Sequence, residues 1–423
     1  MQPESDSAVN AKVPVQRESR GQESEKHSCI YLMDLWSFIP YYIAQLCASL
    51  QAQSVDVMLG STRYHLDRGF FRRSGVNPDP ALLDWGGRIR SPFLRRIVKS
   101  CEYLLNLLVL CVRFSLARPA VVHIQFLPFL DRGFPFEIWF LRWCLRRGIR
   151  IVYTVHNLSE RDARRHSKLL YQRAYSSAHA LICHSEGAKI QLTKNYGLPD
   201  DRIWTIPHGP LFERTMGVTA AEARAQLGLA TDEVVVLCFG VINRYKGIPF
   251  LLDSWKLLTS SGARARLVIA GTGAADLLAD TRQKVSILGL ESSVDLCLDF
   301  IPVDRLSIFH LASDVLVYPY QTGTTSGALL TGMNYGKAIV ATKIPFFVEY
   351  LRDGENALLV RYADVEGLAR ALQKLIGDKE YRDRLARSIQ ERTGTNPSWT
   401  DIAQATKACY DSVLHESHQK SEY

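Results

Sequence analysis

Short apolar runs recur along the chain, and longer amphipathic stretches separate them. The runs in the first half are CIYLMD, SVDVML, AVVHIQF, RIVYTV, ALICHS and RIWTIPHG, and those in the second half are EVVVLCFG, ARLVIAGTG, SVDLCLDF, SDVLVYPY and GKAIVAT. Several are continuous Val, Ile and Leu runs, which are typical of parallel strands buried on both faces. Their alternation with helical patterns predicts an α/β protein with doubly wound sheets.

The alternation is interrupted once, near HGPLFERTMGVTAAEARAQLG, where a Gly-Pro turn precedes a new helix and a new first strand. This break, in a chain of 423 residues, predicts two Rossmann-like domains, at 28–214 and 215–396. Residues 1–27 are polar, have no apolar signal-peptide core and are predicted to be disordered. Residues 397–423 contain an isolated helix, which we expect to return to the first domain, followed by a tail.

The charged residues are unevenly distributed along the chain. The chain carries a net charge of +8, from 51 Lys and Arg against 43 Asp and Glu. Residues 88–168 alone hold 16 Lys and Arg against 5 Asp and Glu, a local balance of +11. Such a zone indicates an anionic membrane, nucleic acid or phosphorylated compound nearby, and a solvated basic face is the alternative. We expect no nucleic-acid partner, because no recognition motif accompanies the basic zone.

Within this zone, RIRSPFLRRIVKSCEYLLNLLVLCVRFSLARP (88–119) joins basic residues to a leucine-rich stretch. Its longest apolar run, YLLNLLVLCV, is about half the length that a membrane-spanning helix needs. A basic helix with an apolar flank can instead lie at an anionic membrane surface. The alternative is that the leucines face the core and the arginines face water.

The nine cysteines form no C-x-x-C pair and no zinc spacing with histidine. Several lie inside the apolar runs, where cysteine behaves as a small core residue. We therefore expect no metal site and a reducing compartment, the cytoplasm, with peripheral association at the cytoplasmic face of the membrane.

In doubly wound folds, ligands bind beyond the carboxyl ends of the strands, so residues that follow the predicted strands are candidates. Arg244 and Lys246 lie on a loop that leads into a helix, a suitable place for a phosphate, although a solvated loop is the alternative. Gly271 and Gly273 follow the next strand, where a ligand or a plain tight turn explains them equally well.

A cluster of small residues, QTGTTSG, follows the strand VLVYPY and precedes a helix. Thr324, Thr325, Ser326 and Gly327 would bring hydroxyls and backbone N–H groups to a positive helix end. The cluster could therefore hold a diphosphate, and a helix cap without a ligand is the alternative.

In the first half, His156 directly follows the strand RIVYTV, and Asn157 comes next. We expect His156 to point into a cleft between the domains, and a buried structural histidine is the alternative. His123 and Gln125 lie at another strand end, and Trp36 and Phe38 follow the first strand, where they could contact an acceptor.

Eight segments occur in an order and spacing that resemble one known family: TVHN, ICHSEGAKIQL, IPHG, FGVINRYKG, LVIAGTG, SDVLVYPY, SGALLTGMNYGKAIVAT and DGENALLV. Over about residues 28–415 the chain resembles the GT-B nucleotide-sugar glycosyltransferases, specifically retaining family 4. The resemblance implies two domains facing a central cleft. It also implies transfer of a sugar from a nucleotide-sugar donor to a lipid-linked or polysaccharide acceptor, with retention and without a metal or another cofactor.

The resemblance also implies roles for individual residues. Donor contacts are implied for Gly240, Arg244, Lys246, Gly271, Gly273, Phe300, Ile301, Thr324, Thr325, Ser326, Gly327 and Thr331, with segment 299–302 seating the base. The reacting sugar would face His156, and the acceptor side would comprise Trp36, Phe38, His123, Gln125 and Asn157.

Three positions depart from the family pattern. Gly323 and Thr331 occupy the places of a usual glutamate pair, and Val241 occupies that of an arginine, which Arg244 would replace. MDLWSFIPYY also stands where a Gly-Gly loop is usual. Branches of the family that act in exopolysaccharide assembly carry a similar SG-x-L-L sequence in place of the glutamates, so loss of activity does not follow. Two alternatives to a transferase follow: a non-catalytic GT-B protein that binds nucleotide or a partner enzyme, and a nucleotide-sugar 2-epimerase.

Overall fold

The computed structural model describes residues 29–89, 91–156, 158, 165–212, 217–393 and 396–419. The predicted tail at 1–27 and the candidate residue Asn157 lie outside these described residues.

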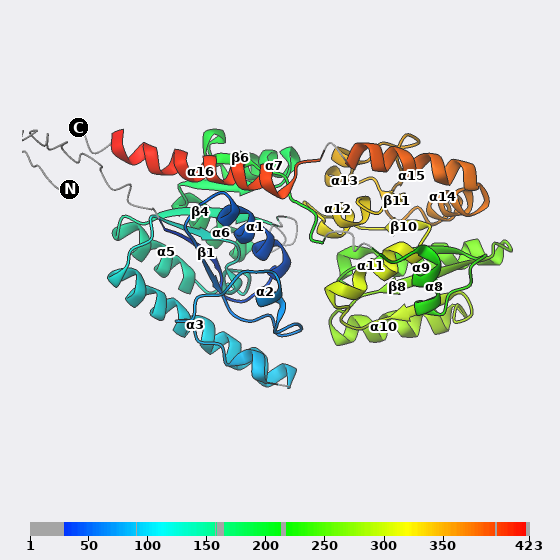
Figure 1. Cartoon of the computed structure of the whole chain (residues 1–423), viewed down its shortest axis with the longest axis horizontal. Helices are drawn as coiled ribbons and strands as arrows, with labels where there is room; N and C mark the ends of the chain where they lie inside the picture. Colours follow the sequence, from blue (N-terminus) through cyan, green and yellow to red (C-terminus); the bar gives the residue numbers. More distant parts are fainter. Residues whose placement is uncertain are drawn as a thin grey trace, which may run out of the picture.

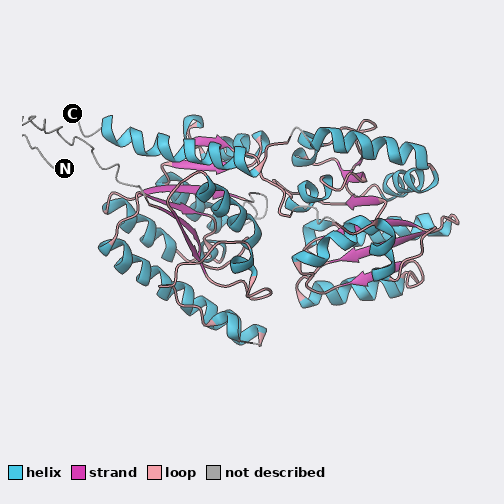
Figure 2. Cartoon of the chain, in the orientation of Figure 1, coloured by secondary structure: helices cyan, strands magenta, loops and turns pink. Residues whose placement is uncertain are grey.

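Each half of the chain forms one parallel sheet of six strands (Figures 1 and 2). In spatial order the first sheet contains β2 (Val57–Ser61), β1 (Ile30–Asp34), β3 (Val121–Ile124), β4 (Arg150–Val155), β5 (Ala180–Cys183) and β6 (Ile203–Thr205). The second contains β12 (Leu358–Val360), β11 (Ala338–Thr342), β10 (Val315–Tyr318), β7 (Val234–Phe239), β8 (Ala265–Ala270) and β9 (Val294–Cys297). Two doubly wound Rossmann-like sheets confirm the predicted fold class.

Helices cover both faces of each sheet (Figure 2). The first half contains α1 (Pro40–Ala52), α2 (Phe70–Arg73), α3 (Pro92–Leu116), α4 (Pro128–Asp131), α5 (Phe136–Arg146), α6 (Arg165–Ser177) and α7 (Glu186–Tyr196). The second contains α8 (Ala220–Leu227), α9 (Ile248–Ser260), α10 (Ala275–Ile287), α11 (Val303–Ala312), α12 (Gly327–Met333), α13 (Pro345–Tyr350), α14 (Val365–Gly377) and α15 (Lys379–Thr393), and α16 (Trp399–Gln419) ends the fold. Short 3₁₀ helices lie at Gly86–Arg88, Asp200–Arg202 and Arg244–Lys246.

The strand order explains where a ligand could bind. In the first sheet the order reverses between β1 and β3, and in the second it reverses between β7 and β10. A doubly wound sheet has its ligand crevice beyond the carboxyl ends of the strands at such a reversal. A ligand-binding site is therefore expected at the loops after β1, β7 and β10.

The last helix, α16, lies against the first sheet beside α1, although the second sheet precedes it in the sequence (Figure 1). Ile402, Ala403 and Tyr410 are buried in one core with residues of α1 and β1. Trp399 Nε1 donates a hydrogen bond to Pro210 O at 2.8 Å. The final helix therefore completes the core of the N-terminal half.

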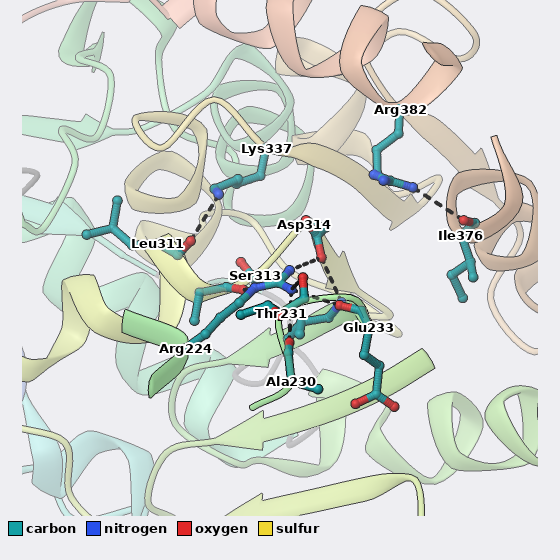
Figure 3. A network of polar contacts seen from close by, with 12 residues as sticks. Arg224, Ala230, Thr231, Glu233, Leu311, Ser313, Asp314, Lys337, Ile376 and Arg382 are labelled. Atoms are coloured by element: carbon teal, nitrogen blue, oxygen red, sulfur yellow. Dashed lines mark hydrogen bonds and ion pairs between the residues drawn. The ribbon is translucent and has the colours of Figure 1, made fainter. Parts of the chain in front are cut away.

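A buried arginine joins the amino ends of the central strands in the second sheet (Figure 3). Arg224, on α8, donates hydrogen bonds to the carbonyl oxygens of Ala230, Thr231, Glu233 and Ala312 at 2.9–3.1 Å. It also forms an ion pair with Asp314, whose carboxylate accepts a hydrogen bond from Val235 N at 2.8 Å. This network fixes β7 beside β10 at the edge opposite their carboxyl ends.

Candidate active site

A cleft of about 400 Å³ lies between the two halves of the chain. This volume falls within the usual range for small-molecule sites, about 300–1,000 Å³. From the first half, its lining includes Phe38, Tyr41, Tyr42, Tyr64, His156, His208, Leu211 and Phe212. From the second half, it includes Gly240, Val241, Tyr245, Lys246, Gly271, Phe300, Ile301, Tyr320, Thr325, Ser326, Gly327 and Thr331. Most of the candidate donor residues thus share one cavity.

The side chain of Lys246 places a buried positive charge at the wall of this cleft. The residue is only 8% exposed, and burial lowers the pKa of its ammonium group. Its Nζ donates a hydrogen bond to the hydroxyl of Tyr320 and lies 4.2 Å from the centre of that ring. No carboxylate of the described residues forms an ion pair with it. Because an uncompensated buried charge is costly, this arrangement favours an anionic ligand.

Two hydroxyls of the small-residue cluster lie in the same cleft. Ser326 caps α12, since its Oγ accepts a hydrogen bond from Leu329 N at 3.2 Å. Thr325 Oγ1 is buried and has no hydrogen-bond partner among the described residues. The cap that was the alternative interpretation of this cluster therefore exists. Thr325, whose hydroxyl has no partner among the described residues, also lines the cleft.

Three candidate donor residues do not line the cleft. Arg244 has a side chain that is 77% exposed and lies 3.5 Å from Asp276 at the surface. Gly273 forms a backbone bridge with Ile242, and a Cβ atom there would lie 2.5 Å from Ile242 O. Thr324 Oγ1 lies 3.4 Å from Leu158 N and 3.5 Å from His156 O. In this structure Arg244 is thus a surface residue, and the other two pack chain segments together.

Gly271 lines the cleft, but it also has a structural reason to be glycine. Its φ angle is +139°, and a Cβ atom would lie 2.2 Å from Gly240 O. The backbones after β7 and β8 therefore approach each other too closely for a side chain. The close approach of these two backbone segments gives both Gly271 and Gly273 a structural reason that needs no ligand.

The two positions of the usual glutamate pair differ in their surroundings. Thr331 is 2% exposed, and its Oγ1 accepts a hydrogen bond from Leu211 N in the first half of the chain at 3.0 Å. A Cβ atom at Gly323 would meet no atom closer than Ile344 Cδ1 at 3.7 Å, which is an ordinary contact. Thr331 therefore links the two halves, and Gly323 leaves room for a side chain.

Gly327 faces a protein side chain rather than open space. A Cβ atom there would lie 2.5 Å from Leu211 Cδ1 and 3.2 Å from His208 Cε1, both in the first half of the chain. We predicted that this glycine lets a ligand approach the backbone. The structure shows that it also admits Leu211 against the start of α12.

Gly327→Ala is expected to lower the free energy of unfolding by about 1–3 kcal/mol, because overpacking displaces neighbouring atoms. Gly323→Ala, the matched control on the same loop, is expected to change it by less than about 1 kcal/mol, because its new methyl group fits. Neither glycine has a positive φ angle, so backbone strain does not distinguish them. Thermal unfolding of both variants checks the difference, and equal melting temperatures would contradict it.

His156 lies at the cleft wall and begins a chain of polar contacts into the first half. It is 7% exposed, its Nε2 lies 2.8 Å from Gln125 Oε1, and its Nδ1 lies 3.1 Å from His184 Nε2. Gln125 Nε2 lies 3.0 Å from His123 Nε2, and His123 Nδ1 lies 2.6 Å from the hydroxyl of Tyr410. The chain thus extends from the cleft to α16.

The hydrogen-bond donors and acceptors along this series of contacts allow two protonation states. His184 Nδ1 lies 3.0 Å from Ile206 O, a carbonyl that only accepts, so this nitrogen carries a proton. A neutral His184 then accepts at Nε2, and His156 must donate from Nδ1. A neutral His156 in turn accepts at Nε2, which requires the amide NH₂ of Gln125 to face it. The structure has the amide oxygen of Gln125 facing His156, and in that orientation the histidine pair holds one additional proton.

The surrounding histidines favour the neutral state. Burial lowers the pKa of His184 to about 4 and that of His123 to about 3. Burial likewise lowers the pKa of His208, which lines the cleft, to about 3. Such low pKa values make these three imidazoles weak proton acceptors at neutral pH.

The acceptor-side candidates separate into two groups. Phe38 lines the cleft and is 44% exposed. Trp36 does not line it; its ring stacks on Phe38 at 6.0 Å, and the guanidinium of Arg132 lies 5.0 Å from the centre of that ring. His123 and Gln125 are fully buried behind His156. These last two residues can act on a ligand only through His156.

Several lining residues were not among the sequence candidates. His208 follows β6, and the neighbouring His184 follows β5, so inspection of every strand end would have found both. Tyr42 lies on α1, and its ring centroid is 4.8 Å from those of His156 and His208. Tyr42 left no signal in the sequence because a helix of apolar and aromatic residues is also typical of a core.

Within the described residues, no three His, Cys, Asp or Glu side chains lie close enough together to hold a metal ion. None of the helices that the structure describes is long and apolar enough to cross a membrane.

Two family models match the two halves of the chain. Residues 39–210 match "Glycosyltransferase Family 4", and residues 219–392 match "Glycosyl transferases group 1". Among curated relatives, D-inositol 3-phosphate glycosyltransferase of Nocardia farcinica is 26% identical over 248 residues, 57% of this chain and 54% of the relative. The enzyme of the same name from Acidothermus cellulolyticus is 29% identical over 259 residues, 57% of each chain. The chain thus spans little more than half the length of these relatives.

Solved structures show the same fold. Sucrose-phosphate synthase from Thermosynechococcus elongatus superposes with a TM-score of 0.72 at 18% identity, covering 92% of this chain and 100% of that one. Anabaena HepE in complex with UDP superposes with a TM-score of 0.67 at 16% identity, covering 91% and 100%. The two matched models, one on each side of the cleft, assign the chain to the GT-B glycosyltransferases of the family 4 type.

Proposed function

We propose that the protein transfers a sugar from a nucleotide-sugar donor, with retention of configuration, to a lipid-linked or polysaccharide acceptor. The observation that carries the proposal is the buried ammonium of Lys246, which lines the cleft and has no carboxylate partner among the described residues. A nucleoside diphosphate is the anionic part of such a donor. UDP and UDP-glucose are the ligands named for the similar HepE structures, so UDP-sugars are the first donors to test.

In this proposal the cleft neutralises the charge that develops as the glycosidic bond breaks. The departing diphosphate gains negative charge, and a fixed cation in a site that excludes water stabilises it strongly. Lys246 is that cation, and Thr325 lines the same cleft. Phe300 and Ile301 lie in the same cleft, where they would pack against the base. Because Lys246 neutralises the diphosphate, we expect transfer to proceed without a divalent metal.

The acceptor would enter against the first half of the chain. There the cleft wall includes the rings of Phe38, Tyr41, Tyr64 and Phe212, and those of Tyr41 and Phe212 lie 4.6 Å apart. Aromatic side chains offer a large apolar contact, and tyrosine adds a polar hydroxyl. This combination suits the alternating apolar and hydroxyl surfaces of a carbohydrate acceptor.

The test is a panel of nucleotide sugars, screened first by thermal shift and then in a turnover assay with and without a lipid-linked or polysaccharide acceptor. A ligand that binds the folded state raises the melting temperature by mass action. Stabilisation by one nucleotide class, with sugar transfer only when acceptor is present, supports the proposal. Interconversion of the sugar without acceptor would instead identify a 2-epimerase.

One observation favours a second candidate, a non-catalytic protein that binds nucleotide or a partner enzyme. Thr331, which stands at the place of a usual glutamate, is occupied by its hydrogen bond to Leu211 N. Gly323, at the place of the other, has no side chain. Stabilisation by a nucleotide without turnover of any donor, with and without acceptor, would establish this candidate.

His156→Ala is expected to slow transfer more than it weakens donor binding, because His156 faces the proposed sugar position rather than the diphosphate. Loss of one buried hydrogen-bond partner costs about 1–3 kcal/mol, which corresponds to a decrease of roughly 5- to 150-fold in kcat. The dissociation constant of the donor should change by less than about threefold, well below 1 kcal/mol. Single-turnover kinetics and calorimetry measure the two quantities, and an unchanged kcat would make His156 a structural residue.

A further inference from the structure

The outward face of α3 is apolar along most of its length. Its exposed side chains recur every three or four residues and are Leu94, Ile97, Cys101, Leu105, Leu108, Val112 and Leu116. Val112 is 64% exposed and Leu116 is 85% exposed. The opposite side of the helix packs into the core through Tyr103, Leu107 and Leu110. The alternative interpretation, in which the leucines face the core, is therefore wrong for Leu105, Leu108 and Leu116.

The neighbouring helix α5 continues this surface. α3 and α5 cover the same face of the first sheet, and α3 runs along the outer edge of the domain (Figure 1). Phe136 and Trp139 on α5 are 45% and 51% exposed. An exposed apolar surface of this kind marks an interaction site in a soluble domain.

The charges around the apolar stripe all have one sign. The two acidic residues of these helices, Glu102 and Glu137, are fully buried. The basic residues at the ends of α3 and along α5 are exposed or half-exposed: Arg88, Arg95, Arg96, Arg118, Arg142, Arg146 and Arg147. The positive charges of α3 also act on a neighbouring group. The pKa of His65 is lowered to about 4, mainly by burial and in addition by the charges of Arg95 and Lys99. A partner for this surface must be apolar in the middle and anionic at its rim.

We propose that the outer face of α3 and α5 is a docking surface for an anionic phospholipid membrane. The apolar stripe would lie in the acyl boundary, the arginines would contact the headgroups, and Trp139 would lie at the interface. A helix of 25 residues is about 37 Å long, so it offers a long contact parallel to the bilayer. A second copy of the chain fits less well, because two basic rims would face each other.

This surface is separate from the cleft, so its test needs no donor or turnover. The protein is sedimented with vesicles of phosphatidylcholine alone, or of phosphatidylcholine with phosphatidylglycerol, in salt from about 50 to about 500 mM. We expect binding only to the anionic vesicles, and weaker binding as salt rises. Equal binding to both vesicle types, or none to either at low salt, would overturn the proposal; the second result would point to an acidic protein partner.

Two double variants test the rim and the stripe. Arg95→Glu with Arg96→Glu should weaken binding by about 30-fold or more, since each basic residue near an anionic surface contributes about a fivefold factor. Leu108→Glu with Val112→Glu should weaken it at least about tenfold, because charge is excluded from the acyl boundary. The matched controls are Arg282→Glu with Arg370→Glu and Leu257→Glu with Ile287→Glu, which lie on exposed positions of the second half. Equal loss in variants and controls would overturn the docking surface, and circular dichroism confirms that each variant is folded.

Discussion

Lys246→Met is expected to lower turnover by about 10²–10³-fold, the usual effect of removing one charge-stabilising group from a transition state. The reason is the position of the ammonium group, buried at the cleft wall beside Tyr320 and unpaired with any carboxylate of the described chain. Methionine keeps most of the volume of the side chain, so the cavity should persist. Steady-state kinetics with the best donor of the panel measures the effect.

The same substitution should stabilise the ligand-free protein, or leave its stability unchanged, because a buried charge without a partner costs free energy. The thermal shift produced by nucleotide should largely disappear. Arg244→Ala is the matched control, since Arg244 is a cation two residues away with a side chain that is 77% exposed. Normal turnover in Lys246→Met, or an equally large loss in Arg244→Ala, would contradict the assignment of the phosphate site.

Acidification from pH 7 to pH 5 is expected to destabilise the protein by on the order of 5 kcal/mol. Four fully buried histidines have lowered pKa values, to about 4 for His184 and His310 and to about 3 for His123 and His208. In the unfolded chain histidine has a pKa of about 6.5. Between about pH 6.5 and pH 4 the unfolded state therefore binds more protons, and stability falls as pH falls.

Buried carboxyl groups act in the opposite direction. Burial raises the pKa of Glu137 to about 8, so the folded state binds its proton first and gains stability on acidification. Burial also raises the pKa of Asp34 and that of Glu102. We expect the four histidines to outweigh these carboxyl groups, since each histidine contributes about 2 kcal/mol at pH 5. Melting temperatures across this range check the prediction, and Glu137→Gln should make the decline steeper. A melting temperature that stays constant from pH 7 to pH 5 would contradict it.

The strands were predictable because parallel strands buried on both faces leave continuous apolar runs. All eleven predicted runs overlap a strand of the structure. The additional strand, β12, has three residues, is half-buried and lies at the edge of its sheet, so its pattern resembles that of a loop.

The cleft was predictable where chemistry follows a strand directly, as it does for His156 and Lys246. It was not predictable where function depends on which segments meet in space. Nothing local to Thr331 indicates that its hydroxyl bonds to Leu211, 120 residues earlier. Likewise, the sequence around Arg244 and Lys246 does not show that one cation points to solvent and the other into the cleft.

The hydrogen bond between Trp399 and Pro210 has a consequence for motion. These residues lie where the polypeptide passes from one half to the other, outward before α8 and back before α16. The two connecting segments lie side by side and can serve as one hinge. We therefore expect the two halves to open mainly by rotation about an axis that passes near Trp399 and Pro210. Contacts near this axis, such as the hydrogen bond between Thr331 and Leu211, would change little. Lys246 would instead move relative to the cleft wall that the first half of the chain forms. A donor could therefore enter an opened cleft and be enclosed when the halves rotate back.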